Sequence, residues 1–325
     1  MLLWQGYLVS PLKNPAGNIK DILEILIPTY NRKVHIRRTL TQLTAKNSPV
    51  KDCQITVLDN ASTDGSSEAI DRFVSFHKNI RHIRHPKNIG GDANIARCYE
   101  LAKAPYVWVV CDDDSFKWDF WYEIENALRT YDYDLLLTTK RDLKNTSNIS
   151  KIFKQCTFVP ACIYRTSLIT DGILMNIYNN LPFLFPHLAL ASKVFNRKGR
   201  IFLPQGEIMD VCNYDKEHSG DGNYTRGNNE YVPNYRKNMF WTVGVIVSTQ
   251  LIEDKKLRNY ILDNLGGHGF CMYIISAFRQ NYKFYEGSKF NEQLVCKSLD
   301  FWHVIQFNMA CLFLKIIYLF SPRKH

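Results

Sequence analysis

Short apolar runs alternate with amphipathic stretches through the first half of this 325-residue chain, and this alternation limits the possible folds more than any other feature. Ile22–Pro28, Ile55–Leu58 and Ile80–Arg84 read as strands, and helical spacing follows them, as in Val34–Leu43. Repeated strand and helix units place parallel strands side by side, with helices on both faces of the sheet. The sequence therefore predicts an α/β fold built on a mostly parallel sheet.

The run Tyr106–Cys111 is almost continuously apolar, and Asp112, Asp113 and Asp114 follow it directly. Such a run predicts a central strand covered on both faces, whose carboxyl end lies at the edge where open α/β sheets bind ligands. Three adjacent carboxylates repel one another unless a cation neutralises them, and hard oxygen ligands suit Mg²⁺ or Mn²⁺. Because alternate residues of an extended segment point the same way, we expect Asp112 and Asp114 to hold the metal and Asp113 to face the sheet or a ribose.

A plainer interpretation treats the three aspartates as a solvated turn that caps a helix from Trp118 to Arg129. Two other predicted strand ends argue for a shared site, because polar residues follow them in Pro28–Arg32 and in Asp59–Asn60. If the three strands are neighbours, these polar ends meet in one crevice.

Four segments together resemble the inverting glycosyltransferases of family 2, which have the GT-A fold. They are Ile-Leu-Ile-Pro-Thr-Tyr-Asn-Arg at 25–32, Leu-Asp-Asn-Ala-Ser-Thr-Asp-Gly at 58–65, Lys-Asn-Ile-Gly-Gly at 87–91 and the aspartates at 112–114. The segments occur in the family's order and at its spacing. The resemblance implies inverting transfer of a sugar from a nucleotide-diphosphate donor, expected to be a UDP-sugar, with Mn²⁺ or Mg²⁺ as cofactor. The implied acceptor is a glycan or a lipid-linked glycan in surface polysaccharide or glycoconjugate synthesis.

The resemblance also assigns roles to individual residues. Tyr30 matches the ring that stacks on the nucleotide base, and Asp59 matches the carboxylate that binds the base or ribose. The residues expected to bind the donor are Pro28, Thr29, Tyr30, Arg32, Asp59, Asn60, Lys87, Asn88, Gly90, Asp112 and Asp113. Structural alternatives stay open, with Tyr30 as a core residue, Lys87 as a solvated cation and Gly90 as a turn residue. Asn31 and Asp64 are expected to cap local structure.

The general base that deprotonates the acceptor hydroxyl is harder to place. Many relatives use an aspartate that opens a helix after the acceptor-side strand, whereas this chain has Phe-Pro-His-Leu at 185–188. Histidine acts as a base near neutral pH, but a histidine beside apolar residues also serves a structural role. We predict His187 and Asp210 as catalytic residues, and the further candidates are Asp215, Asp119 and Glu123. His218 lies in a segment that resembles the family's mobile loop over the diphosphate, and it is a third predicted metal ligand.

We expect an N-terminal extension over residues 1–20, a glycosyltransferase domain over 21–233 and a helical region over 234–325. The helical region contains Phe301–Phe320, which is strongly apolar yet includes polar residues such as Gln306 and Lys315. These residues disfavour a membrane span. Two interpretations compete, an amphipathic helix on an anionic membrane surface and a helix that packs against the core or in a homodimer.

The formal net charge of +10 favours anionic partners such as nucleotide phosphates or an acidic membrane face. The sequence has no block of basic residues, no paired Cys/His zinc spacing and no basic helix interleaved with aromatics, which argues against nucleic acid as a partner. Nine cysteines without a short-loop framework, and an N-terminus without a secretion signal, favour a cytoplasmic protein, peripheral at the inner membrane face if the last helix binds there. Two rival functions stay open, a nucleotidyltransferase and a non-catalytic nucleotide-sugar-binding or interaction protein.

Overall fold

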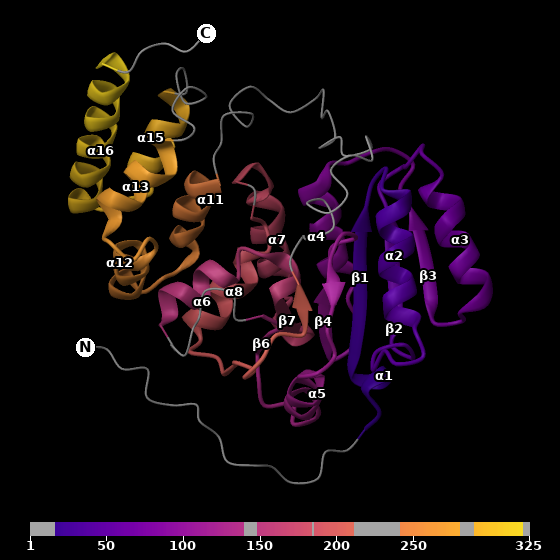
Figure 1. Ribbon diagram of the computed structural model, residues 1–325. Coiled ribbons are helices and arrows are strands. Elements are labelled where there is room, and N and C mark those ends of the chain that lie inside the picture. The colour runs from indigo at the N-terminus through magenta and orange to yellow at the C-terminus, as the bar shows by residue number, and fades with distance from the viewer. Residues whose placement is uncertain (1–16, 140–147, 184, 211–240, 280–288, 321–325) are drawn as a thin grey trace.

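The computed structural model describes residues 17–139, 148–183, 185–210, 241–279 and 289–320. Its centre is a seven-stranded sheet with the order β3-β2-β1-β4-β7-β6-β8 (Figure 1). The strands of this sheet are β1 (Leu23–Thr29), β2 (Gln54–Asp59), β3 (Ile80–Arg84), β4 (Tyr106–Val109), β6 (Leu135–Leu137), β7 (Cys162–Arg165) and β8 (Ile201–Phe202). All neighbours run parallel except at β7, which is antiparallel to β4 and to β6. The predicted mostly parallel sheet is therefore confirmed.

Helices cover both faces of the sheet. They are α1 (Ile19–Ile22), α2 (Lys33–Thr44), α3 (Ser66–Phe76), α4 (Gly91–Leu101), α5 (Trp121–Arg129), α6 (Ile149–Gln155), α7 (Asp171–Asn179) and α8 (Leu188–Asn196). Ile25, Ile27 and Trp108 pack on one face with α1, α2, α3 and α5. Leu26 and Val109 pack on the other face with α4, α6, α7 and α8. Because successive strand residues face opposite sides and both sides are covered, these strands are mostly apolar along their length.

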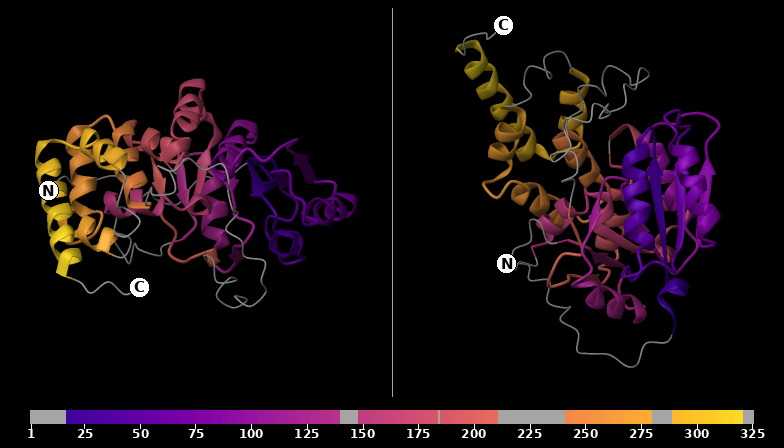
Figure 2. Two further views of the ribbon diagram at one scale, coloured as in Figure 1. Left: turned by 90° about the horizontal axis from the view of Figure 1, so that it is seen from above. Right: turned by 45° about the vertical axis from the view of Figure 1, so that its right-hand side comes forward.

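The C-terminal part is helical in the residues described, which confirms the predicted helical appendage. Its helices are α11 (Trp241–Ser248), α12 (Lys255–Asn264), α13 (Phe270–Arg279), α15 (Lys289–Lys297) and α16 (Phe301–Phe320). They lie on the side of the molecule away from β3 (Figure 2). Val243 of α11 and Ile261 of α12 join the same apolar core as α6 and α8. The predicted domain boundary at 233 falls outside the described residues. None of the helices in the described ranges is both long enough and apolar enough to cross a bilayer.

β7 begins at Cys162, directly after a 3-10 helix, η1 (Val159–Ala161), in which Pro160 has no N–H to donate to a sheet. The helix expected from Trp118 begins at Trp121. Further 3-10 helices are η2 (Thr166–Leu168), η3 (Leu181–Phe183) and η4 (Thr249–Leu251).

A second, two-stranded sheet joins the segment after β4 to a distant part of the chain. It pairs β5 (Ser115–Phe116) with β9 (Met209–Asp210) in antiparallel register, with Ser115 opposite Asp210. The pairing brings the backbone of Asp210 in β9 beside the end of the aspartate cluster.

Candidate functional site

The carboxyl ends of β1, β2 and β4 lie side by side. Thr29 at the end of β1 pairs with Asp59 at the end of β2, and the N–H of Val110 after β4 donates to the carbonyl of Leu26 in β1 at 3.0 Å. Thr29 Oγ1 then donates to Asp112 Oδ2 at 2.6 Å. The predicted convergence of three polar strand ends is thus confirmed, and it places the aspartate cluster next to the loop that follows β1.

The three aspartates form a turn, so the expected alternation of their side chains is wrong. Arg32 Nη1 donates to Asp112 Oδ1 at 2.7 Å and to Asp113 Oδ2 at 2.9 Å, so these two carboxylates meet at one cation. Asp114 folds back, and its Oδ2 accepts from the N–H of Cys111 at 3.1 Å. The alternation argument holds only for an extended chain, whereas β4 ends at Val109 and a turn begins at Asp112.

Two side chains of α2 hold the backbone of this turn in place. Arg38 Nη2 donates to the carbonyls of Asp113 and Asp114 at 2.7 and 2.8 Å, and Thr39 Oγ1 donates to the carbonyl of Asp112 at 2.8 Å. Sequence reasoning did not identify Arg38 or Thr39. Their only signal is their place on the helix that follows the Thr29–Arg32 loop, and nothing local links that helix to a turn more than 70 residues away.

Burial makes the negatively charged form of the acidic turn unfavourable unless a cation lies nearby. It raises the pKa of Asp112, against the opposing effect of Arg32. The pKa of Asp114 lies well above its usual range because the carboxyl group is buried and Asp113 is close. For Arg32, burial disfavours the charged form, but Asp112 and Asp113 outweigh it and raise the pKa of the guanidinium. A cation added near Asp114 would therefore be strongly favoured.

The donor atoms of this turn fit a divalent metal ion. Ligand atoms of Cys111, Asp113 and Asp114 lie within 4.8 Å of one another, and the buried Asp114 Oδ1 has no hydrogen-bond partner among the described residues. Carboxylate oxygens suit Mg²⁺ and Mn²⁺, whereas the Cys111 thiol is a softer ligand than these ions prefer. The aspartates are thus the residues of this group that could hold such an ion, with Asp112 adjoining them.

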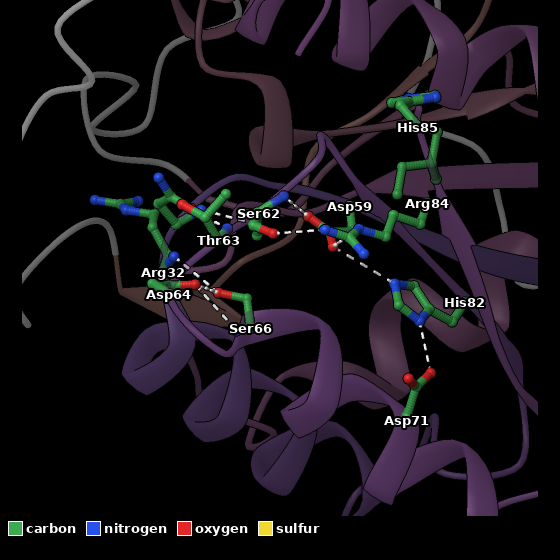
Figure 3. Close-up of polar contacts among 12 residues, drawn as sticks. Arg32, Asp59, Ser62, Thr63, Asp64, Ser66, Asp71, His82, Arg84 and His85 are labelled. Atoms are coloured by element: carbon green, nitrogen blue, oxygen red, sulfur yellow. Dashed lines mark hydrogen bonds and ion pairs between the residues drawn. The ribbon is translucent and has the colours of Figure 1, made fainter. Parts of the chain in front are cut away.

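Asp59 forms a buried acceptor at the end of β2 (Figure 3). Its Oδ1 accepts from the N–H of Ser62 at 2.9 Å, while Arg84 Nε and His82 Nε2 lie 3.5 and 3.8 Å from Oδ2. Burial acts to raise the pKa of Asp59, but the nearby His82 ring and the hydrogen bond from Ser62 outweigh it and hold the pKa below its ordinary value. Asp59 is therefore a carboxylate that stays charged, and a charged carboxylate accepts from N–H or hydroxyl groups.

The Lys87–Gly90 loop is anchored to the end of β2 by amide groups. Asn60 Nδ2 donates to Asn88 Oδ1 at 2.8 Å, and Asn60 Oδ1 accepts from the N–H of Ile89 at 2.9 Å. Gly90 has a φ of 90°, where a side chain would be strained, so it serves this turn whatever else it does. Lys87 is exposed, and Pro28 and Tyr30 are partly exposed at the β1 end. Tyr30 is therefore not a core residue.

Asn31 and Asp64 accept hydrogen bonds from backbone N–H groups near the starts of α2 and α3, although the N-cap residues of these helices are Arg32 and Gly65. Asn31 has a φ of 51°, and its Oδ1 accepts from the N–H of Thr63 at 2.7 Å. Asp64 accepts from the N–H groups of Lys33 and Ser66, so it links the starts of α2 and α3 (Figure 3). These contacts join the 29–32 loop to the 59–66 loop.

The candidate bases differ in their surroundings. His187 is 1% exposed, its Nε2 lies 3.1 Å from the carbonyl oxygen of Thr157, and burial lowers its pKa to about 4. Asp119 is exposed, and Glu123 accepts from the N–H of Gln205 at 2.6 Å. The backbone of Asp210 pairs with Ser115, directly after the aspartate turn, while its side chain, together with Asp215 and His218, lies outside the described residues. The catalytic roles of His187 and Asp210 stay predictions.

Known proteins resemble this chain in sequence over the same region. Residues 24–199 match the sequence model of a family described as Glycosyl transferase family 2. The chain is 33% identical over 99 residues to the abequosyltransferase RfbV of Salmonella typhimurium, a match that covers 30% of each chain. It is 22% identical over 252 residues to a poly(ribitol-phosphate) beta-glucosyltransferase of Bacillus spizizenii, covering 73% of this chain and 38% of that protein. The chain thus spans about a third of the length of the curated relatives it matches.

Solved structures share the architecture. Residues 1–349 of Staphylococcus aureus TarS, in complex with UDP-GlcNAc, superpose with a TM-score of 0.53 at 16% identity, covering 92% of this chain and 91% of that one. The mannosyltransferase PcManGT of Pyrobaculum calidifontis, in complex with GDP-Man and Mn²⁺, gives a TM-score of 0.51 at 14% identity, covering 99% and 92%. Identity this low compares folds only, and the likeness confirms the predicted GT-A fold.

Proposed function

Because the chain belongs to glycosyl transferase family 2, we propose that it is a metal-dependent glycosyltransferase that moves a sugar from a nucleotide-diphosphate donor to an acceptor hydroxyl. The observation that carries this proposal is the contact of Thr29 and Arg32 with Asp112, which joins two strand ends into one charged site. The expected donor is a UDP-sugar, as the TarS complex contains.

The proposed nucleotide site lies around the ends of β1 and β2. Asp59 keeps its negative charge and would accept a hydrogen bond from the base or the ribose, and the partly exposed ring of Tyr30 would stack on the base. Pro28 and Asn60 are next to these residues in the chain. Asn88 and Gly90 form the turn that follows Lys87, and Asn60 holds this turn through Asn88. Lys87 and Arg32 would pair with phosphate oxygens.

The metal ligands we propose from the sequence are Asp112 and Asp114, and Asp113 is proposed beside them because its ligand atom lies within 4.8 Å of that of Asp114. The unpartnered Oδ1 of Asp114 and the raised pKa of its carboxyl group support a cation at this turn. When bound there, Mn²⁺ or Mg²⁺ supplies a Lewis acid that stabilises charge on the departing nucleotide. The protein's own part is to hold the carboxylates in one turn through Arg38 and Thr39, and to offer Arg32 to the diphosphate. His218 as a further ligand stays a prediction.

For the acceptor we propose a glycan or lipid-linked glycan and transfer with inversion. The names of two relatives, an abequosyltransferase and a poly(ribitol-phosphate) glucosyltransferase, support a setting in surface polysaccharide synthesis by analogy alone. We propose Asp210 ahead of His187 as the base, since its backbone adjoins the aspartate turn while His187 is buried against a backbone carbonyl. A cytoplasmic setting is also proposed, and the free thiols among the described cysteines fit it.

The test is a thermal-shift screen of nucleotide sugars with and without Mn²⁺, on the wild type, on Asp114→Ala and on Asp52→Ala. Asp52 is an exposed carboxylate at the other end of β2 and serves as the matched control. We expect one nucleotide sugar to raise the unfolding temperature only with Mn²⁺, in the wild type and the control but not in Asp114→Ala. A shift that persists without metal, or in Asp114→Ala, would contradict a metal-bound donor.

Slow hydrolysis of the same nucleotide sugar separates an enzyme from a binding protein. We expect Mn²⁺-dependent release of the sugar from the stabilising donor, and none from Asp114→Ala. Binding without any release would favour the non-catalytic alternative. Stabilisation by a nucleoside triphosphate with a sugar phosphate, but by no nucleotide sugar, would favour a nucleotidyltransferase.

A further inference from the structure

The last helix, α16, packs on the protein through one face only. His303, Phe307 and Leu314 are buried on that face. The ring of His303 meets the ring of Phe270 in α13 edge to face, with centroids 4.9 Å apart, and Asp300 and Asp263 hold its two nitrogens at 2.7 and 3.1 Å. This face is thus fixed by apolar and polar contacts, and α16 is a packed element of the fold rather than a loose tail.

The opposite face of α16 is apolar and exposed. Trp302, Met309 and Leu312 are 68%, 61% and 59% exposed. At about 100° per residue, the outward-facing apolar residues fall within an arc of about 120° that contains no polar side chain. This exposed strip consists of the half-buried Ile305 and of six exposed residues, Phe301, Trp302, Met309, Leu312, Phe313 and Ile316. A continuous apolar surface of this kind marks an interaction site.

Polar residues and charge indicate which partner fits the strip. Asn308 and Lys315 border one edge, Gln306 borders the other, and the helix contains no aspartate or glutamate. Lys315 is half exposed, with its Nζ 4.0 Å from Glu292. The whole chain has a net charge of +10, so a second copy would bring like charge to the strip, whereas an anionic surface brings the opposite charge. Aromatic rings at one end, at Phe301 and Trp302, also suit a lipid interface.

The position of α16 leaves the strip accessible to a flat surface. In Figure 1, α16 lies at the outer side of the C-terminal helices, with α13 between it and the rest of the protein, and the yellow α16 is also outermost in the left view of Figure 2. We propose that α16 lies on an anionic membrane surface, with its axis in the plane of the membrane and the exposed strip inserted among the lipids. The inference does not depend on the sugar-transfer reaction.

The experiment measures co-sedimentation of the full chain with vesicles of phosphatidylcholine alone and of phosphatidylcholine with phosphatidylglycerol. The strip variant Met309→Glu/Leu312→Glu is compared with Phe76→Glu/Met175→Glu, which adds the same charge at two exposed apolar residues of α3 and α7. We expect the wild type to bind the anionic vesicles, the strip variant to lose about tenfold or more of its partitioning, and the control to stay within about twofold. Thermal unfolding checks that each variant is folded.

Two results would overturn the proposal. In the first, the wild type does not bind anionic vesicles, or the two double variants lose binding equally, so that charge alone decides. In the second, light scattering shows a wild-type dimer that the strip variant converts to a monomer while vesicle binding is absent, which would assign the strip to a second copy of the chain. A supporting result is a shift of tryptophan emission to shorter wavelength on anionic vesicles that Trp302→Phe lacks.

Discussion

Arg32 Nη1 lies 2.7 Å from Asp112 Oδ1, and the same nitrogen lies 2.9 Å from Asp113 Oδ2. One guanidinium therefore contacts two of the three adjacent carboxylates after β4 and offsets the charge of only one. The Arg32 side chain comes from the loop between β1 and α2 and is 24% exposed, so it can move without opening the core. A divalent cation that binds these carboxylates has to compete with Arg32, and a displaced Arg32 is then available to the phosphates of the donor.

Arg32→Ala leaves Asp112 and Asp113 without their shared cation. We expect the free energy of unfolding to fall by about 2–3 kcal/mol without metal, somewhat less than for a fully buried pair because water reaches Arg32. Mn²⁺ should restore part of this loss, since it supplies the missing charge. Urea unfolding with and without Mn²⁺ measures both effects, and Arg37→Ala, an exposed residue of α2, is the control. An equal loss with and without Mn²⁺ would show that metal and Arg32 do not share these carboxylates.

Thr29→Val removes the hydroxyl that donates to Asp112 at 2.6 Å. A hydrogen bond to a buried charged group contributes about 1.5–3 kcal/mol, so we expect a loss of that order in the free energy of unfolding. Mn²⁺ affinity should also fall, because the pKa of Asp112, already raised by burial, rises further without this bond. Calorimetric titration with Mn²⁺ and urea unfolding are the measurements. Thr29→Ser keeps the hydroxyl and should retain most of both quantities; a loss as large as that of Thr29→Val would trace the effect to packing.

The contact of His82 with Asp59 predicts a pH-dependent stability. The pKa of His82 is raised above its ordinary value of 6.5, mainly by Asp59, so the stability that His82 contributes is present below pH 6.5 and is lost as pH rises through the raised pKa. The pKa of Asp59 is lowered below 3.8. The stability that the Asp59 carboxylate contributes is therefore lost only as pH falls through this lowered pKa. We expect His82→Gln to lower the unfolding temperature more at pH 5.5 than at pH 8.5. The exposed His268→Gln is the control, and a larger effect at pH 8.5 would have the wrong sign.

Much of this site could be predicted from the order of apolar runs and polar ends. Four apolar runs locate β1 to β4, and parallel strands place their carboxyl ends at one edge, so the meeting of Thr29, Asp59 and Asp112 follows from the pattern. The orientation of the aspartates does not follow, because a turn has no period of two. Contacts such as those of Arg38 and His82 depend on how helices and strands pack, and separations of 75 and 23 residues leave no local signal.

His187→Gln tests whether the buried histidine is structural. Burial lowers the pKa of His187 to about 4, so the folded protein holds it neutral while the unfolded chain binds a proton below about pH 6.5. The wild type should therefore lose stability as pH falls from 6.5 to 4, and His187→Gln should lose less over that range. Turnover per folded molecule at neutral pH should stay within a few-fold of the wild type. A large fall in turnover with normal donor binding would instead support the catalytic role predicted for His187.

Asp210→Asn tests the other predicted base. The β5–β9 pairing holds the backbone of Asp210 opposite Ser115, directly after the aspartate turn, and this backbone position is the ground for predicting Asp210 as the base. General base catalysis contributes about 100-fold or more, and we expect turnover to fall by at least that factor. The donor-induced, Mn²⁺-dependent thermal shift should remain, because no donor contact is removed. Asp171→Asn at the start of α7 is the control. If Asp210→Asn abolishes the thermal shift as well, Asp210 belongs to the donor or metal site, and the base must be sought elsewhere.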